Sequence, residues 1–241
     1  MDLKDIGIDV IAANEIVKTR SETHKILYPE CKMINGDITE CSTQDEIVNI
    51  CRNNKVDLII ATPPCQGLST AGKNKKIEEL YTDKRNFLIL SALGIVDRVM
   101  PNYFIIENVP RFQKMVFPYN NELISLEKLL EAKYSDKYNI DCKLYNSADY
   151  GVPQTRFRIV YKVWKKGLKW EEPQTKPPIS LEKAIGDLPS LEAGETSNIK
   201  NHFARKHPVN HIECMRHTPT GKSAFTNEEY YPKKSDVSRI K

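Results

Sequence analysis

The sequence predicts an α/β protein with a doubly wound, mostly parallel sheet, followed by a smaller and irregular module. Short apolar segments alternate with longer amphipathic segments through the first 163 residues, which is the pattern of strands that alternate with helices. From Trp164 to Pro178 this alternation gives way to lysines, acids and three prolines, a composition typical of a linker. We therefore expect a domain over residues 1–163, a linker over 164–178 and a second module over 179–241.

Each predicted element has a local signal. Strands are expected where apolar, β-branched or aromatic residues cluster, at 8–13, 32–35, 56–61, 103–106, 140–146 and 158–163. The last two are expected to form an antiparallel pair. Helices are expected at 15–27, 44–53, 86–100, 123–132 and 179–188. Ser42 or Thr43 is the expected N-cap of the second helix and Asp83 that of the third, which Pro101 ends.

The composition bounds the class of protein. A chain of 241 residues can bury one sizeable core, and 40% hydrophobic with 28% charged residues is an ordinary soluble composition. No apolar run approaches the roughly 20 residues of a membrane span, and the N-terminus lacks the pattern of a signal peptide. The six cysteines are scattered without paired spacing, so we expect reduced thiols and a cytoplasmic location.

The net charge of +4 is unevenly distributed. Residues 164–241 hold 14 Lys and Arg against 10 Asp and Glu, whereas the charges of residues 1–163 cancel. A basic C-terminal third suits contact with a polyanion, because Lys and Arg displace counterions from a phosphate backbone. An ordinary solvated surface is the alternative, and charge alone favours it.

One segment, Thr62-Pro63-Pro64-Cys65-Gln66-Gly67, organises the chain. It follows the apolar strand expected at 56–61, and ligands of open α/β sheets bind beyond the carboxyl ends of the strands. Each proline fixes its own φ and restricts the residue before it, so Cys65 is held with little backbone freedom. A thiol in that place can act as a nucleophile, and the alternative is a structural cysteine after a turn.

Three motifs, in order along the chain, carry a resemblance to a known family. Pro63-Pro64-Cys65-Gln66, Glu107-Asn108-Val109 and Gln154-Thr155-Arg156-Phe157-Arg158 resemble motifs of the cytosine-5 DNA methyltransferases of bacterial restriction–modification systems. The resemblance covers residues 3–163 well and 178–225 loosely. It implies a Rossmann-like S-adenosylmethionine-dependent methyltransferase sheet, a partial target-recognition region, S-adenosylmethionine as cofactor and double-stranded DNA as substrate.

The resemblance assigns a role to each matching residue. Cys65 would add to carbon 6 of cytosine, because carbon 5 is a poor nucleophile until a thiolate converts the ring into an enamine. Glu107 would contact the ring nitrogen and the exocyclic amine, and Arg156 would stabilise charge on the base carbonyl. Asn108 would shape the turn after its strand. Arg158 would support the loop that carries Arg156. The alternative for Glu107 is an ordinary surface acid. The alternative for Arg156 and Arg158 is a solvated strand edge.

Two acids at strand ends are candidates for cofactor binding. Glu15 follows the first expected strand and Asp37 the second, and acids in such places accept hydrogen bonds from ribose hydroxyls in nucleotide-binding folds. The resemblance implies that they hold the ribose and the adenine amine of S-adenosylmethionine, with Pro63 on the same side. Capping or turn-forming acids are the alternative for both.

Two further regions are expected to face DNA. The target base must leave the duplex to be methylated, and segment 67–81, with its glycines and lysines, is expected to form a lid over it. Phosphate and groove contacts are expected from His202, Arg205, His207, Arg216, Thr218, Pro219, Gly221 and Lys222. A metal could be bound by His207, His211, Cys214 and His217, but the zinc signatures of the family are absent, so no metal is expected.

The resemblance leaves both ends of the family pattern unmatched. A glycine-rich turn that cradles the methionine part of the cofactor has no counterpart, and the strand before it would be central, between those at 8–13 and 56–61. The final family segments, after the recognition region, have no counterpart either. We therefore expect residues 1–241 alone to be inactive and expect that a second chain could supply the missing motifs.

Two alternative functions stay open. One is a non-catalytic remnant or partner-dependent subunit that binds DNA or a complementary chain. The other is an RNA cytosine-5 methyltransferase of the same fold. An adenine-amino methyltransferase is disfavoured, because that chemistry uses Asp-Pro-Pro-Tyr-like loops and needs no thiol.

Overall fold

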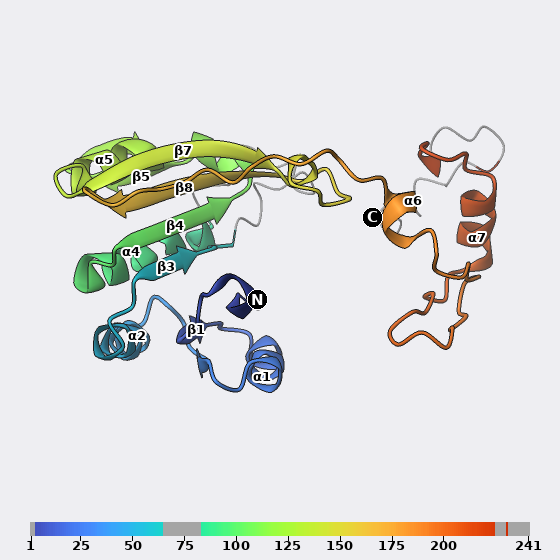
Figure 1. Cartoon of the computed structure of the whole chain (residues 1–241), viewed down its shortest axis with the longest axis horizontal. Coiled ribbons are helices and arrows are strands. Elements are labelled where there is room, and N and C mark those ends of the chain that lie inside the picture. The colour runs from blue at the N-terminus through green and yellow to red at the C-terminus, as the bar shows by residue number, and fades with distance from the viewer. Residues whose placement is uncertain (1–2, 65–82, 225–229, 231–241) are drawn as a thin grey trace. The chain divides into compact units, whose positions relative to one another are not determined.

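The computed structural model of the chain describes residues 3–64, 83–224 and 230 (Figure 1). The chain divides into two compact units, Met1–Ile179 and Ser180–Lys241. None of the helices in the described ranges is long and apolar enough to cross a membrane. The predicted nucleophile Cys65 and the predicted lid 67–81 lie outside the described residues.

Four strands form the main sheet of the first unit. In spatial order they are β3 (Leu58–Ala61), β4 (Tyr103–Asn108), β8 (Phe157–Lys165) and β7 (Tyr138–Asn146) (Figure 1). β3 runs parallel to β4, whereas β8 runs antiparallel to both of its neighbours. The predicted antiparallel pair is thus confirmed. The sheet is mixed rather than mostly parallel, because β7 and β8 are antiparallel neighbours that need no crossover helix.

A second, two-stranded parallel sheet holds the start of the chain. β1 (Ala12–Asn14) pairs with β2 (Lys32–Ile34), and α1 (Lys18–Leu27) connects them. Among the described strands, β1 pairs only with β2 and β3 only with β4, so the two parallel pairs are separate. The strand without a counterpart is expected between β1 and β3, and these two strands do not pair with each other.

The core lies between one face of the main sheet and the helices α4 (Leu88–Val99) and α5 (Leu126–Tyr134). Phe104 and Ile106 of β4 point to that face and are buried. The Phe104 ring packs edge-on against Tyr134 and Tyr138, with ring centroids 5.3 and 5.8 Å away. Because successive strand residues face opposite sides, Glu107 points to the other face of the sheet.

A hairpin that was not expected lies before α5. β5 (Val116–Tyr119) and β6 (Glu122–Ser125) pair antiparallel around Asn120 and Asn121, which both have positive φ, at 47° and 66°. The helix expected at 123–132 therefore begins only at Leu126, where the Ser125 side chain caps it. Two left-handed residues suit the primed turns of tight hairpins, so the Asn-Asn pair is a signal that could have revealed this one.

The other helices of the first unit follow the predicted positions with shifted ends. α2 (Cys41–Asn53) begins after Glu40, so the N-cap expected at Ser42 or Thr43 is wrong, and both residues lie within its first turn. The Asp83 cap is confirmed, because its side chain accepts from the Arg85 backbone N–H at 3.1 Å and opens the 3-10 turn Lys84–Phe87 before α4.

The second unit has two short helices in its described part. α6 (Leu181–Ile185) is shorter than the helix expected at 179–188, and the Ser180 side chain caps it by accepting from the Lys183 backbone N–H at 3.1 Å. α7 (Val209–Arg216) was not expected, because polar residues obscure its periodicity. The segment expected as a linker, 164–178, begins inside β8 and continues as chain bound to the first unit.

Candidate active site

Asn108 joins the ends of the neighbouring parallel strands β3 and β4. Its side-chain amide donates to the Pro63 carbonyl at 3.2 Å, and its side-chain oxygen accepts from the Val109 backbone N–H at 2.8 Å. The residue is only 2% exposed, so both bonds are partly shielded from water. Asn108 therefore fixes the segment that leads directly to Cys65.

Glu107 points to the opposite face of β4 from Asn108 and pairs with Arg158 of β8. The Arg158 Nε lies 2.7 Å from Glu107 Oε1, and both side chains are partly buried. The Arg158 guanidinium also donates to the Phe157 carbonyl at 2.8 Å. The ion pair holds a carboxylate and a guanidinium together beside the strand end that Asn108 fixes.

Arg156 lies in the loop between β7 and β8. Its backbone N–H donates to Asn146 Oδ1 at 3.1 Å, and its carbonyl accepts from the Ser147 backbone N–H at 3.0 Å. The side chain is exposed, and no hydrogen bond or ion pair to its guanidinium occurs within the described ranges. The backbone is thus held in place while the cation stays available to a ligand.

Glu15 follows β1, whose end Asn14 ties to the end of β2. The Asn14 side-chain amide donates to the carbonyls of Ile34 and Gly36 at 3.1 and 2.9 Å. Glu15 Oε1 accepts from the Val17 backbone N–H at 2.9 Å, so this acid forms the turn into α1. Asn14 was not singled out from the sequence, although an amide at the end of a strand is a signal for such a link.

Asp37 occupies the corresponding place after β2. Its Oδ1 accepts from the Thr39 backbone N–H and hydroxyl at 2.9 and 2.8 Å, and these bonds lower the pKa of Asp37. Gly36 allows α2 to approach, because a Cβ there would lie 2.5 Å from Thr43 Oγ1. Glu15 and Asp37 therefore follow the carboxyl ends of two paired parallel strands, the place of ligand-binding acids in α/β sheets.

Three other cysteines are poor candidates for a nucleophile. Cys31 and Cys51 are buried, and burial raises the pKa of both thiols. Burial also raises the pKa of Cys142. A raised pKa disfavours the thiolate, which is the reactive form, so these three thiols are inert compared with an exposed one.

An open depression of about 790 Å³ lies between the two-stranded sheet of β1 and β2 and α2. Ile11, Lys32, Ser42 and Asn49 are among its lining residues, and none of the predicted site residues is. Ile11 and Lys32 stand at the amino ends of β1 and β2, whereas Glu15 and Asp37 follow the carboxyl ends. The depression is therefore not the predicted cofactor site.

Two of the four possible metal ligands in the second unit contact Tyr230 instead. The Cys214 thiol donates to the Tyr230 carbonyl at 2.9 Å, and the His217 ring stacks on the Tyr230 ring with centroids 3.7 Å apart. Within the described part of the chain, no group of three or more His, Cys, Asp or Glu is arranged to hold a metal ion.

Fold and site together define an α/β protein in which the Pro63-Pro64 segment, a Glu-Asn strand end and an arginine-bearing loop come from neighbouring strands of one mixed sheet. A family model for C-5 cytosine-specific DNA methylases matches residues 1–240. The chain belongs to this family.

Curated relatives are type II methyltransferases. M1.HgaI from Avibacterium volantium is 41% identical over 239 residues, which are 99% of this chain and 67% of that protein. M1.HphI from Haemophilus parahaemolyticus is 33% identical over 217 residues, 89% of this chain and 56% of that protein. The chain thus spans between about half and two thirds of these relatives. M.AquIA from Picosynechococcus differs in extent: it is 31% identical over an alignment of 229 residues, and the match covers 81% of this chain and 90% of that protein.

Solved structures share the fold. A protein described as a DNA modification methyltransferase encoded within an E. coli prophage superposes with a TM-score of 0.59 at 22% identity, covering 97% of this chain and 63% of that chain. A DNMT2 variant from Spodoptera frugiperda superposes with a TM-score of 0.50 at 24% identity, covering 73% of this chain and 49% of that chain.

Proposed function

We propose that the chain carries the catalytic residues of a type II DNA methyltransferase, which transfers a methyl group from S-adenosylmethionine to carbon 5 of a flipped-out cytosine in double-stranded DNA. The observation that carries this proposal is the hydrogen bond from Asn108 to the Pro63 carbonyl. It binds the Glu-Asn strand end to the segment that immediately precedes Cys65. Two of the three resembling motifs are therefore neighbours in space as well as in the family pattern.

The residues have distinct roles in the proposed reaction. The Cys65 thiolate adds to carbon 6 of the base, which makes carbon 5 nucleophilic, and it leaves again when carbon 5 loses its proton. Glu107 binds the ring nitrogen and the exocyclic amine, so it selects cytosine. Arg156 stabilises charge on the base carbonyl with its exposed guanidinium. Asn108 and Arg158 hold these groups in place through their bonds to Pro63 and Glu107.

Glu15, Asp37 and Pro63 are the residues proposed to hold the cofactor. S-adenosylmethionine supplies an electrophilic methyl group when bound. The donor set suits it, because Glu15 and Asp37 place carboxylates after two adjacent parallel strands, where such acids accept hydrogen bonds from ribose hydroxyls. The mixed sheet is proposed to be the Rossmann-like sheet of these enzymes, with the second unit as part of the target-recognition region.

The test is covalent trapping on DNA that contains 5-fluorocytosine. The chain is used alone and fused to the segments of M1.HgaI that it does not match. Cys65→Ala should abolish trapping by the fusion and leave DNA binding largely intact. Cys41→Ala, which changes an exposed cysteine of α2, is the matched control and should trap normally. Trapping that survives Cys65→Ala would contradict the assignment of the nucleophile.

We further propose that residues 1–241 alone transfer no measurable methyl group. The separation of β1 from β3 supports this, because β1 leads to the proposed cofactor acid Glu15 and β3 leads to Cys65. Misplacement of a reacting group by about 1 Å can cost on the order of 100-fold in rate. The edges of β1 and β3 that no described strand pairs should also make the lone chain prone to aggregate. Transfer from radiolabelled cofactor by the chain alone, lost on Cys65→Ala, would contradict this expectation.

A partner-dependent subunit is the second candidate. Such a subunit would bind DNA or a complementary chain without transferring a methyl group by itself. Activity that appears only on mixing with a second chain would distinguish it, and an RNA substrate in the same assay would test the RNA alternative.

A further inference from the structure

The segment 166–176, called the strap below, turns back along the main sheet after β8. Gly167, with φ of 90°, lies where the chain reverses. Trp170 then packs against Tyr103 of β4 and Trp164 of β8, with ring centroids 6.0 and 5.9 Å away. At the far end the Lys176 backbone N–H donates to the Asp149 carbonyl at 2.7 Å. The strap therefore runs from the end of β8 to the loop that precedes β8.

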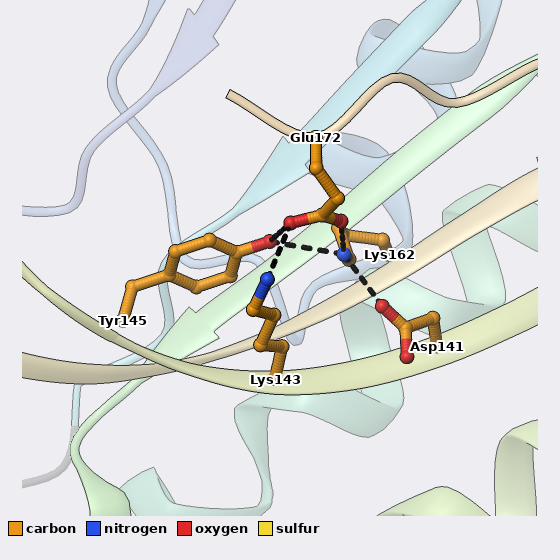
Figure 2. Close-up of polar contacts among 5 residues, drawn as sticks. All are labelled: Asp141, Lys143, Tyr145, Lys162 and Glu172. Carbon is orange, nitrogen blue, oxygen red and sulfur yellow. Dashed lines mark hydrogen bonds and ion pairs between the residues drawn. The ribbon is translucent and has the colours of Figure 1, made fainter. Parts of the chain in front are cut away.

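A charged cluster fixes the middle of the strap. Figure 2 shows its five members, Asp141, Lys143, Tyr145, Lys162 and Glu172. The Lys162 ammonium donates to Glu172 Oε1 and to the Tyr145 hydroxyl, the latter at 2.9 Å, and lies 2.5 Å from Asp141 Oδ2. Glu172 Oε2 accepts from Lys143 Nζ at 2.9 Å and from the Tyr145 hydroxyl at 2.7 Å. Both oxygens of Glu172 are thus bound to the sheet.

The buried ammonium of Lys162 strengthens the contact between Glu172 and the sheet. It is 2% exposed, and a buried ammonium is tolerated only when it is paired and hydrogen-bonded. Burial by itself lowers the pKa of Lys162, but hydrogen bonds with Asp141, Glu172 and Tyr145 outweigh this and raise it. The hydrogen bond from Lys162, followed by that from Tyr145, lowers the pKa of Glu172 to about 2. Lys162 and Glu172 are therefore both charged at neutral pH.

The strap and the cluster both reach the loop that bears Arg156. Lys176 binds the turn at 147–151 through Asp149 and through a bridge with Tyr150. Ser147 of the same turn donates to the Arg156 carbonyl at 3.0 Å. On the strand side, Tyr145 lies opposite Arg158, the partner of Glu107. Glu172 is thus connected to the Arg156 loop at both ends.

We propose that Glu172 is a positioning residue: by closing the strap on Lys162 and Tyr145, it holds the loop 147–156 and so places Arg156. The role of Arg156 in stabilising charge on the base rests on the proposed function. The role of Glu172 in fixing the loop 147–156 does not. No contact of Glu172 with substrate or cofactor is implied.

The test compares Glu172→Gln with Glu171→Gln in the full chain. The control removes the same charge from an exposed neighbour. Trp164 and Trp170 are the two tryptophans of the chain and both contact the strap region, so their fluorescence reports its release. Glu172→Gln should shift the emission to longer wavelength and speed amide hydrogen exchange at 147–158 about tenfold, because a charged hydrogen-bond partner is lost. Exchange in β4 and α4 should not change, and Glu171→Gln should behave as the parent.

Three outcomes would overturn the proposal. The first is an unchanged tryptophan emission. The second is a shifted emission without faster amide exchange at 147–158. The third is amide exchange that becomes equally faster throughout β4 and α4. The last would assign the cluster to general stability. Tyr145→Phe, which removes only the shared hydroxyl, repeats the test if Glu172→Gln unfolds, and the same three outcomes apply to it.

A kinetic readout separates positioning from binding. In the trapping-competent fusion, Glu172→Gln should slow covalent trapping at saturating DNA and leave the Kd for DNA within about twofold. Weaker DNA binding with an unchanged trapping rate would contradict positioning. The exchange experiment uses neither DNA nor cofactor, so it can succeed or fail independently of the Cys65 assignment.

Discussion

The side-chain amide of Asn108 lies 3.2 Å from the carbonyl oxygen of Pro63, a residue 45 positions earlier in the chain. The same side chain also accepts from the Val109 backbone N–H. One buried amide therefore sets the distance between the ends of β3 and β4, from which two of the three family motifs extend.

Asn108→Ala should destabilise the chain by about 1–3 kcal/mol, because it leaves a partly buried carbonyl and a partly buried N–H without this partner. Asn108→Asp should also destabilise, since it keeps the bond to Val109 but sets a carboxylate oxygen against the Pro63 carbonyl. Urea unfolding measures both changes. Asn53→Ala, at an exposed site in α2, is the control and should stay within about 0.5 kcal/mol. Equal effects at positions 108 and 53 would contradict the structural role of Asn108.

Gly36 should tolerate no side chain, whereas Gly94 should. A Cβ at Gly36 would lie 2.5 Å from Thr43 Oγ1, so Gly36→Ala should lower the melting temperature. Thr43→Ala in the same chain should recover most of that loss by removing the clashing atoms. Gly94 lies inside α4, where a Cβ would make an ordinary contact 3.7 Å from Gln44 Oε1, so Gly94→Ala should stabilise by roughly 0.5–1 kcal/mol. Failure of Thr43→Ala to rescue would show that the clash is not the cause.

The stability of the chain should depend on the anionic partners of the buried Lys162 ammonium. Changing Asp141→Asn and Glu172→Gln together should destabilise by on the order of 3–5 kcal/mol, because the ammonium stays buried without an anionic partner. Adding Lys162→Met should restore most of this, since an apolar chain replaces the buried charge. Lys143→Met, at the exposed lysine of the cluster, should cost no more than about 1 kcal/mol. A triple variant as unstable as the double would contradict this account.

The second unit should carry most of the sequence preference for DNA. Deleting 180–241 follows the boundary between the two units, so the circular dichroism and cooperative unfolding of the first unit should persist. Binding to DNA should become less sensitive to salt, because lysines and arginines that are expected to contact phosphates are removed. A salt dependence equal to that of the full chain would assign DNA contact to the first unit instead.

Local signals predicted much of the fold. The antiparallel pairing of β7 with β8 and the Asp83 cap depend on residues close in sequence, and both are confirmed. The hairpin of β5 and β6 was missed because its strands are short and resemble the start of the following helix. The N-cap of α2 was misplaced because Ser42 and Thr43, residues that favour caps, lie inside the helix.

The site could be predicted only in its parts. Residue types pointed to Glu107, Arg156 and Arg158, but the ion pair of Glu107 with Arg158 depends on the register between β4 and β8. Lys162 gave no functional signal, because a lysine in a strand is expected to face solvent. Its burial results from the strap, whose return over the sheet depends on contacts of Trp170 and Glu172 with three strands.

The return of the strap also divides the outer face of the main sheet lengthwise. Over β8 and β7 that face is occupied, whereas Ile60 of β3 is 47% exposed and neighbours the half-buried Ile105 of β4. Strands lie about 4.8 Å apart, so the lane over β3 and β4 that the strap leaves uncovered, in the part of the chain that the structure describes, is about 10 Å wide. This equals the diameter of one helix with its side chains. The surface over β3 and β4 is therefore as wide as a single helix, and the Trp170 ring borders it on the side of β8.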